Sequence, residues 1–360
     1  MFTSPHLVDF RERIQVQGDM ISKADTTRLG NRLLSMDFGV CPTMFDYCLA
    51  MALLYFKEQK CDVVILETGL GGTYDSTNAC GVPDVTVIAK IGFDHMAILG
   101  DTLAQIAAEK AGIIKHGTAL VLESQEKEAM DVLNKAAERA DIKTIKVVNL
   151  DEIRILPQKD GKQCFSYAGY DAVTMKMLGV HQYENAVAAM LAAELFFEKY
   201  FAGKKNVPEL KALQHAIREG IDRTQWMGRM ELVSNDPFFL MDGAHNSNGV
   251  EALKKSLETM YPDEKFHFIM GVMADKDYGE MIRELLPLAL DFKTVTVESE
   301  RALQGEALAD CIREKGIPAE AYQNLADVLP DFSKSSTEKT VAFGSLYFIG
   351  EIEVFLQGKQ

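Results

Sequence analysis

The stretch CDVVILETGLGGTYDSTNA, residues 61–79, decides the fold class because it joins a short apolar run to a polar, glycine-rich turn. Two similar apolar runs follow at 85–91 and 118–123, and residues 101–115 between them have helical periodicity. Short, nearly unbroken apolar runs are typical of parallel strands that are buried on both faces. The sequence therefore predicts an α/β fold with a mostly parallel sheet, in which 61–66 is a strand.

The second half of the chain repeats this α/β pattern. Apolar runs that end in polar turns begin at residues 238, 266, 292 and 340. Between the two patterns, short alternating segments at about 145–178 indicate a small antiparallel insert. Because 360 residues are too many for one ordinary core, we expect two domains, 1–224 with the insert and 228–360.

Composition excludes several classes of protein. The formal net charge of −15 argues against a nucleic-acid binder, which needs a basic surface to neutralise phosphates. The six cysteines have no CxxC spacing, so they indicate neither a zinc site nor a disulfide framework. No run approaches the roughly 18 apolar residues of a membrane span, and the first residues do not resemble a signal peptide. We expect a cytoplasmic protein without membrane or nucleic-acid partners.

Two polar residues directly follow the first two predicted strands. Glu67 ends the first run and His95 follows the second, and ligands of open α/β sheets bind beyond the carboxyl ends of strands. Each residue alone is more often a cap or a satisfied hydrogen-bonding group. Together they can ligate a divalent metal, for which the carboxylate favours magnesium and the histidine favours zinc or manganese.

Lys110 occupies an unusual position in the predicted helix at 101–115. It lies seven residues after Leu103, on the apolar stripe and not on the solvent face. One interpretation is a snorkelling side chain whose stem covers apolar surface. The alternative is a functional lysine, because burial favours the neutral amine, which can add carbon dioxide to form a carbamate.

Nine motifs occur in order along nearly the whole chain: TSPHL, PTMFDY, ETGLGGTYDSTN, DHMAILGDTLAQIAAEKAGIIK, HQYENA, WMGRME, DGAHNSNG, GVMADKDY and GSLYFIGEI. In this combination they resemble the folylpolyglutamate synthase/dihydrofolate synthase family, a branch of the Mur ligase superfamily. This resemblance implies a P-loop-type ATPase domain followed by a Rossmann-like C-terminal domain. It also implies that ATP activates a carboxylate as an acyl phosphate, which the amino group of L-glutamate then attacks.

Position by position, the resemblance assigns roles to individual residues. It implies Mg²⁺ ligands at Ser4, Glu67 and His95, a carbamylated lysine at Lys110, and catalytic roles for Lys110, Asp242 and His245. The implied ATP contacts are Asn185, Arg229, Asp242 and His245. The implied pterin-binding residues are Thr43, Phe45, Asp46, Tyr74, Asp75 and Ser76, although the family more often has glutamate at position 46. From the sequence pattern alone, we would interpret Arg229 as a surface cation, and Asp242 and Asn246 as helix caps.

One family motif is missing from the sequence. Members carry a phosphate-binding loop that resembles GTNGKGS upstream of TSPHL, whereas no Gly-Lys-Ser or Gly-Lys-Thr occurs here. We therefore expect that this chain lacks the first strand, the P-loop and the helix that family members have before TSPHL, and that neighbouring strands expose unpaired edges without them. On this basis we expect the 360-residue chain alone to be destabilised and nearly inactive.

Two other functions stay open at this point. One is a Mur-type ligase that acts on nucleotide-sugar peptides, although TSPHL and DHMAILGDT belong to the folate branch. The other is a catalytically inactive homologue that binds ligands without turnover, against which the intact Glu67, His95 and Lys110 argue. For the leading interpretation we expect small-molecule substrates, namely ATP, L-glutamate and dihydropteroate or folates, and a monomeric enzyme.

Overall fold

The computed structural model describes residues 1–159 and 161–358. It divides into two compact units, Met1–Lys146 and Val147–Gln360. This division does not test the boundary expected between 224 and 228, which stays a prediction. Within the described residues, no helix is both long and apolar enough to cross a membrane.

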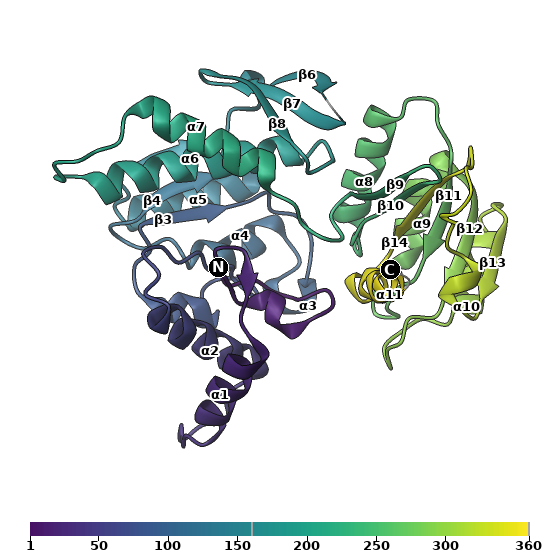
Figure 1. Cartoon of the computed structure of the whole chain (residues 1–360), viewed down its shortest axis with the longest axis horizontal. Coiled ribbons are helices and arrows are strands. Elements are labelled where there is room, and N and C mark those ends of the chain that lie inside the picture. The colour runs from purple at the N-terminus through teal and green to yellow at the C-terminus, as the bar shows by residue number, and fades with distance from the viewer. Residues whose placement is uncertain (160, 359–360) are drawn as a thin grey trace. The chain divides into compact units, whose positions relative to one another are not determined.

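The sheet of the first unit has the strand order β3-β4-β5, with β3 (Val85–Ile88), β4 (Ala119–Leu122) and β5 (Ile145–Val147). β3 and β4 are parallel, as the sequence predicts. Helices α4 (Leu103–Ala111) and α5 (Lys127–Arg139) pack against this sheet through a shared apolar core (Figure 1). Thr102 and Gln105 form the capping box that begins α4, so this helix starts where its sequence requires.

The N-terminal part of this unit forms a second apolar core. It buries Phe2, Ile14 and Leu29 completely. The helices here are α1 (Lys23–Leu34) and α2 (Met44–Glu58), beside the hairpin of β1 (Gln15–Val16) and β2 (Asp19–Met20). The short helical elements of the unit are η1 (Phe10–Arg13), η2 (Ser76–Cys80) and α3 (Met96–Leu99).

The predicted strand at 61–66 is wrong. Only Leu66 makes a β-bridge, which is parallel to Phe2, while Val63, Val64 and Ile65 are exposed. An apolar run becomes a strand only when a neighbour completes its hydrogen-bond ladder. Within the described chain, Phe2 gives this segment its one bridge, so the ladder stops there. Burial on both faces is also wrong for β3, since Val87 is exposed.

The second unit begins with an antiparallel sheet, at the place where the sequence predicts antiparallel strands; their assignment to the first domain stays a prediction. Its strands are β6 (Arg154–Lys159), β7 (Lys162–Tyr167) and β8 (Tyr170–Met175). Two helices follow, α6 (Gln182–Phe201) and α7 (Leu210–Arg223), and α7 packs on β8. The unit also contains the short helix η3 (Leu150–Glu152).

A six-stranded sheet with the order β13-β12-β11-β14-β10-β9 forms the rest of this unit. All neighbours are parallel except β9 and β10, which confirms the predicted Rossmann-like arrangement. The strands are β9 (Glu231–Asn235), β10 (Phe238–Met241), β11 (Phe266–Met270), β12 (Ala289–Val295), β13 (Ala319–Tyr322) and β14 (Lys339–Phe343). The helices are α8 (Ser247–Met260), α9 (Tyr278–Leu285), η4 (Leu286–Leu288), α10 (Gly305–Arg313), η5 (Leu325–Asp327) and α11 (Leu346–Gln357).

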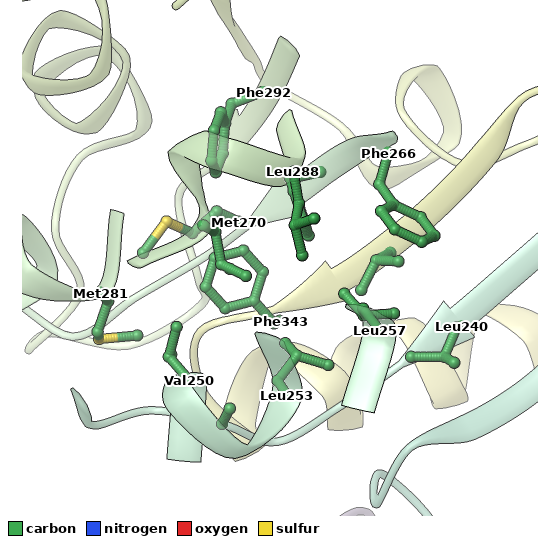
Figure 2. Close-up of a cluster of buried hydrophobic side chains, with 14 of the residues drawn as sticks. Leu240, Val250, Leu253, Leu257, Phe266, Met270, Met281, Leu288, Phe292 and Phe343 are labelled. Atoms are coloured by element: carbon green, nitrogen blue, oxygen red, sulfur yellow. The ribbon is translucent and has the colours of Figure 1, made fainter. Parts of the chain in front are cut away.

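One large apolar core joins this sheet to its helices. Figure 2 shows Val250, Leu253 and Leu257 of α8 facing side chains such as Phe266 and Phe343 of the strands. All five are essentially inaccessible to solvent. This core fixes the carboxyl end of β10 and the start of α8, where the second set of predicted site residues lies.

Candidate active site

The first predicted metal ligands, Ser4 and Glu67, lie side by side. The backbone N–H of Ser4 donates to Oε2 of Glu67 at 2.8 Å, and the hydroxyl of Thr3 donates to the same oxygen. Because Oε2 accepts both bonds, Oε1 of the exposed carboxylate is available to another ligand. Magnesium prefers carboxylate and hydroxyl oxygens, so the chemistry of this pair fits the ion that the resemblance implies.

His95, the third predicted ligand, caps the short helix α3 in a left-handed backbone conformation with φ of 50°. Such a conformation is costly for a residue with a β-carbon, and it often occurs at functional sites. The imidazole Nε2 lies 3.9 Å from a carboxylate oxygen of Asp94. Within the described residues, no cluster of three or more His, Cys, Asp or Glu side chains is arranged to hold a metal ion. The ligand role of His95 therefore stays a prediction.

Lys110 is half-buried near the end of α4. Its neighbours Ile106, Ala107 and Ala111 are buried, so the lysine lies on the side of the helix that the sequence predicts. Burial lowers the pKa of the Lys110 ammonium, and the nearby Asp94 carboxylate opposes this only in part. The lowered pKa increases the fraction of neutral amine, which is the reactive form of a lysine.

The glycine-rich turn packs on the same end of α4. The backbone N–H of Thr73 donates to the carbonyl of Glu109 at 2.9 Å. A β-carbon on Gly72 would lie 2.7 Å from that carbonyl oxygen and 2.9 Å from the carbonyl oxygen of Lys110. Gly72 is therefore required for helix packing, and the turn holds the segment that carries Lys110 in place.

Four of the predicted pterin-binding residues connect two segments of the first unit. Thr43 and Asp46 form the capping box of α2, and the Ser76 hydroxyl donates to Asp46 Oδ1 at 2.5 Å. These bonds lower the pKa of Asp46, the one from Ser76 most strongly. Oδ2 of Asp75 accepts the backbone N–H groups of Gly69 and Leu70 at 2.9 Å each. The bond from Ser76 to Asp46 thus joins α2 to the turn, while the bonds of Thr43 and Asp75 order each segment.

The other two predicted pterin-binding residues are aromatic. The Phe45 ring packs edge-on against Phe2, with 5.5 Å between ring centroids, and lies against the backbone of Gly69. Tyr74 is 91% exposed. The ring of Tyr74 is therefore accessible to a substrate ring.

All four predicted nucleotide contacts line one pocket in the second unit. The pocket has a volume of about 430 Å³ and lies beside the carboxyl end of β10 and the first turn of α8. Ligands of open α/β sheets bind at such strand ends. The predicted residues that line it are Asn185, Arg229, Asp242 and His245.

Asp242 is buried and uses both carboxylate oxygens for backbone N–H groups. Oδ2 accepts from Met230 and Oδ1 from Ala244, each at 2.8 Å. Burial raises the pKa of Asp242, and the two N–H groups and Arg229 oppose this. Met230 has φ of 47°, a left-handed backbone conformation that is unfavourable for a residue with a β-carbon. The hydrogen bond from its N–H to Asp242 stabilises this conformation and so fixes the backbone next to Arg229. Asp242 is thus not the helix cap that its sequence position allows.

Arg229 and His245 lie on either side of Gly243. A β-carbon on Gly243 would lie 3.0 Å from Nη1 of Arg229, so the guanidinium lies against this backbone. His245 Nδ1 lies 2.8 Å from the carbonyl oxygen of Gly243. Because a carbonyl only accepts, Nδ1 carries the proton in this bond. The alternative role of Asn246 as a helix cap is confirmed, since its Oδ1 accepts from Gly249 N–H at 2.8 Å.

The pocket also contains residues that our sequence reasoning missed. His181 and Gln182 line it beside Asn185, and Trp226 lines it as well. His181 and Gln182 begin the HQYENA motif, from which only the asparagine was assigned a role. Their position in the same motif was the available signal.

His181 predicts a pH-dependent loss of stability. Burial, with a smaller effect of Arg229, lowers its pKa from 6.5 to about 4. Below pH 6.5 the unfolded chain therefore binds this proton and the folded chain does not, so acidification destabilises the fold. Relative to His181→Gln, the wild-type free energy of unfolding should fall by about 2 kcal/mol between pH 7 and pH 4.5. Urea unfolding at both pH values measures this, and parallel changes in the two proteins would contradict it.

Comparison with known proteins gives matches over nearly the whole chain. Residues 31–193 match the family described as the Mur ligase middle domain, and residues 228–343 match the Mur ligase glutamate ligase domain. The chain is 35% identical to the dihydrofolate synthase/folylpolyglutamate synthase of Bacillus subtilis, with 98% of this chain and 82% of that protein covered. The corresponding protein of Mycobacterium tuberculosis is 32% identical, with 91% and 71% covered.

Solved structures give a concordant result. Mycobacterium tuberculosis folylpolyglutamate synthase complexed with ADP is similar, with a TM-score of 0.82 and 28% identity over 98% of this chain and 83% of that one. The E. coli FolC structure in complex with DHPP and ADP has a TM-score of 0.82 and 25% identity, with 99% and 81% covered.

Proposed function

The chain belongs to the folylpolyglutamate synthase/dihydrofolate synthase family of Mur ligases, and from this premise we propose the reaction that it catalyses. It adds L-glutamate to dihydropteroate, to folate polyglutamates or to both, with hydrolysis of ATP to ADP and phosphate. The observation that carries this proposal is the pocket of the second unit, which collects Asn185, Arg229, Asp242 and His245 at a strand end.

The reaction proceeds through an acyl phosphate. A carboxylate oxygen of the pterin substrate attacks the γ-phosphorus of ATP, and the bond to the β-phosphate oxygen breaks to release ADP. The amino group of L-glutamate then attacks the acyl carbon, phosphate leaves with the bonding electrons, and the nitrogen loses a proton. Phosphoryl transfer is catalysed mainly by positioning and charge neutralisation. Arg229 supplies a positive charge in the pocket, directed by the turn that Asp242 holds.

In the first unit, we assign Ser4, Glu67 and His95 to hold Mg²⁺. The ion, when bound, neutralises phosphate charge. Glu67 offers its Oε1, because Thr3 and Ser4 already donate to Oε2. Lys110, carbamylated on its lowered-pKa amine, supplies a second carboxylate. From the resemblance in sequence we also expect the protein to be cytoplasmic and monomeric. Size-exclusion chromatography tests the expected monomeric state.

The proposed function is tested by the release of ADP. We would compare this chain with a product extended upstream in frame, and measure ADP release that depends on L-glutamate, Mg²⁺ and dihydropteroate or a reduced folate. Dependence on all these reactants supports the ligase, and turnover confined to the extended form supports the expectation for the 360-residue chain. Binding without turnover in both forms would favour an inactive homologue.

Arg229→Met is expected to weaken ATP binding about 10- to 100-fold, because a hydrogen bond to a charged group contributes about 1.5–3 kcal/mol. Methionine keeps much of the side-chain length and removes the charge. Titration calorimetry with ATP measures the effect. Arg223→Met is the matched control, since Arg223 is an exposed cation of the same unit. Equal affinity in the two variants would contradict a phosphate-binding role for Arg229.

A further inference from the structure

A series of hydrogen bonds links His181, Gln182 and Asn185 at the start of α6, where all three line the nucleotide pocket. We infer that His181 and Gln182 are positioning residues that fix the side-chain amide of Asn185 so that it selects adenine over guanine. This inference rests on the proposed function, because it concerns the nucleotide of that reaction. It assigns roles to two residues that do not transfer phosphate themselves.

The direction of each hydrogen bond follows from the chemistry of the partners. Nε2 of Gln182 lies 3.1 Å from Nε2 of His181, and an amide nitrogen can only donate, so the imidazole nitrogen accepts. At the other end, Nδ2 of Asn185 donates to Oε1 of Gln182 at 3.0 Å. The acceptor nitrogen of His181 thus sets the orientation of Gln182. Gln182 in turn sets the orientation of the Asn185 amide.

The environment of His181 keeps it neutral and in place. Its Nδ1 is buried, with no hydrogen-bond partner among the described residues. A β-carbon on Gly179 would lie 2.8 Å from Cε1 of the ring, so the imidazole packs directly on this glycine, whose φ is 107°. Burial lowers the pKa of His181 to about 4, so near neutral pH its Nε2 keeps the lone pair that accepts from Gln182.

The backbone that carries His181 is itself held by buried side chains. Nε2 of Gln163 donates to the carbonyl of Gly179 at 3.1 Å and to that of Met177 at 2.8 Å. The N–H of Val180 donates to Oγ of Ser256 at 3.1 Å, which ties the segment to α8. These bonds pre-organise the start of α6 before a ligand binds.

The groups that remain on Asn185 match one base. Asn185 is exposed in the pocket, and its bond to Gln182 leaves Oδ1 as an acceptor and the second Nδ2–H as a donor. Adenine presents an N6–H donor next to the N7 acceptor, which is the complementary pattern for an asparagine amide. Guanine presents two acceptors, O6 and N7, so its O6 would face Oδ1 of Asn185. The fixed amide therefore favours ATP over GTP.

Direct binding of ADP and GDP tests the inference without requiring turnover. We expect the wild-type chain to prefer ADP by roughly 10-fold or more, and Gln182→Met to lose most of this preference because the Asn185 amide is free to rotate. Gln182→Glu should lose only part of it, since a carboxylate oxygen still accepts from Nδ2 of Asn185 but cannot donate to Nε2 of His181. Glu198→Gln, at an exposed position farther along α6, should leave the ADP-to-GDP ratio unchanged.

Three results would overturn the inference. They are an unchanged ratio in Gln182→Met, an equal loss in Gln182→Glu and Gln182→Met, and an ADP preference that survives Asn185→Ala. The last variant changes an exposed residue, so it gives an answer even if Gln182→Met does not fold. An ADP preference that depends on Gln182, in a protein of which no form transfers glutamate, supports the inference and rejects the proposed function. Normal glutamate transfer with a ratio insensitive to Gln182 does the reverse.

Discussion

Gly112→Ala is expected to destabilise the first unit by about 3 kcal/mol or more, at the upper end of the cost of overpacking. A β-carbon at this position would lie 2.6 Å from the backbone nitrogen of Thr73, and closer still to Cα and Oγ1 of the same residue. Two of these three atoms belong to the backbone, so a rotamer change cannot relieve the clash. The glycine-rich turn must therefore move away from α4, and it loses the bond from Thr73 N–H to the Glu109 carbonyl.

Urea unfolding, followed by circular dichroism, measures this effect. Gly220→Ala is the matched control, because Gly220 lies in α7 and a β-carbon there would have no atom within 4 Å. A glycine-to-alanine change in an open helix position should stabilise by about 0.5–1 kcal/mol. The two substitutions thus have opposite expected signs. A shift of the same sign and size in both proteins would contradict the packing argument.

The fold was predictable where local pattern and tertiary partners agree. The apolar runs at 238–241 and 266–270 are almost entirely buried strands that each pair with a neighbour on both sides, as their composition predicts. The run at 61–66 has the same composition but makes only the bridge from Leu66 to Phe2. Composition reports that a segment fits a sheet, whereas the hydrogen-bond ladder depends on a partner elsewhere in the chain.

Residue types in the candidate site were predictable, but their partners were not. A strand-end aspartate such as Asp242 can bind a ligand, cap a helix or hold a turn. Only the structure shows that two backbone N–H groups donate hydrogen bonds to its carboxylate. Likewise, a glycine-rich turn can leave room for a ligand or for a closely packed helix, and only the structure shows that Gly72 approaches α4. The HQYENA motif places Gln182 near Asn185 in the sequence, but only the structure shows that Asn185 Nδ2 donates to Gln182 Oε1.

Lys110→Met is expected to lower the rate of glutamate transfer at least about 100-fold, the scale of losing a preorganised charged group in an active site. Methionine fills similar space on a half-buried helix face, so the fold should be kept. The substitution removes the amine. Its lowered pKa favours the neutral form, which can add carbon dioxide and so place a carboxylate at this position. The rate is measured in the form of the protein that turns over, with Lys127→Met, an exposed change at the start of α5, as control.

A second measurement separates the carbamate from a snorkelling lysine. Wild-type protein equilibrated with ¹³C-labelled carbon dioxide should show a carbamate signal in the NMR spectrum, and Lys110→Met should lack that signal. Because only the neutral amine reacts, the signal should increase with pH up to the point where Lys110 is fully deprotonated. A snorkelling side chain predicts no signal at Lys110 and near-normal glutamate transfer in Lys110→Met. Those two results together would leave Lys110 with a packing role only, since its stem covers the same apolar stripe as Ile106.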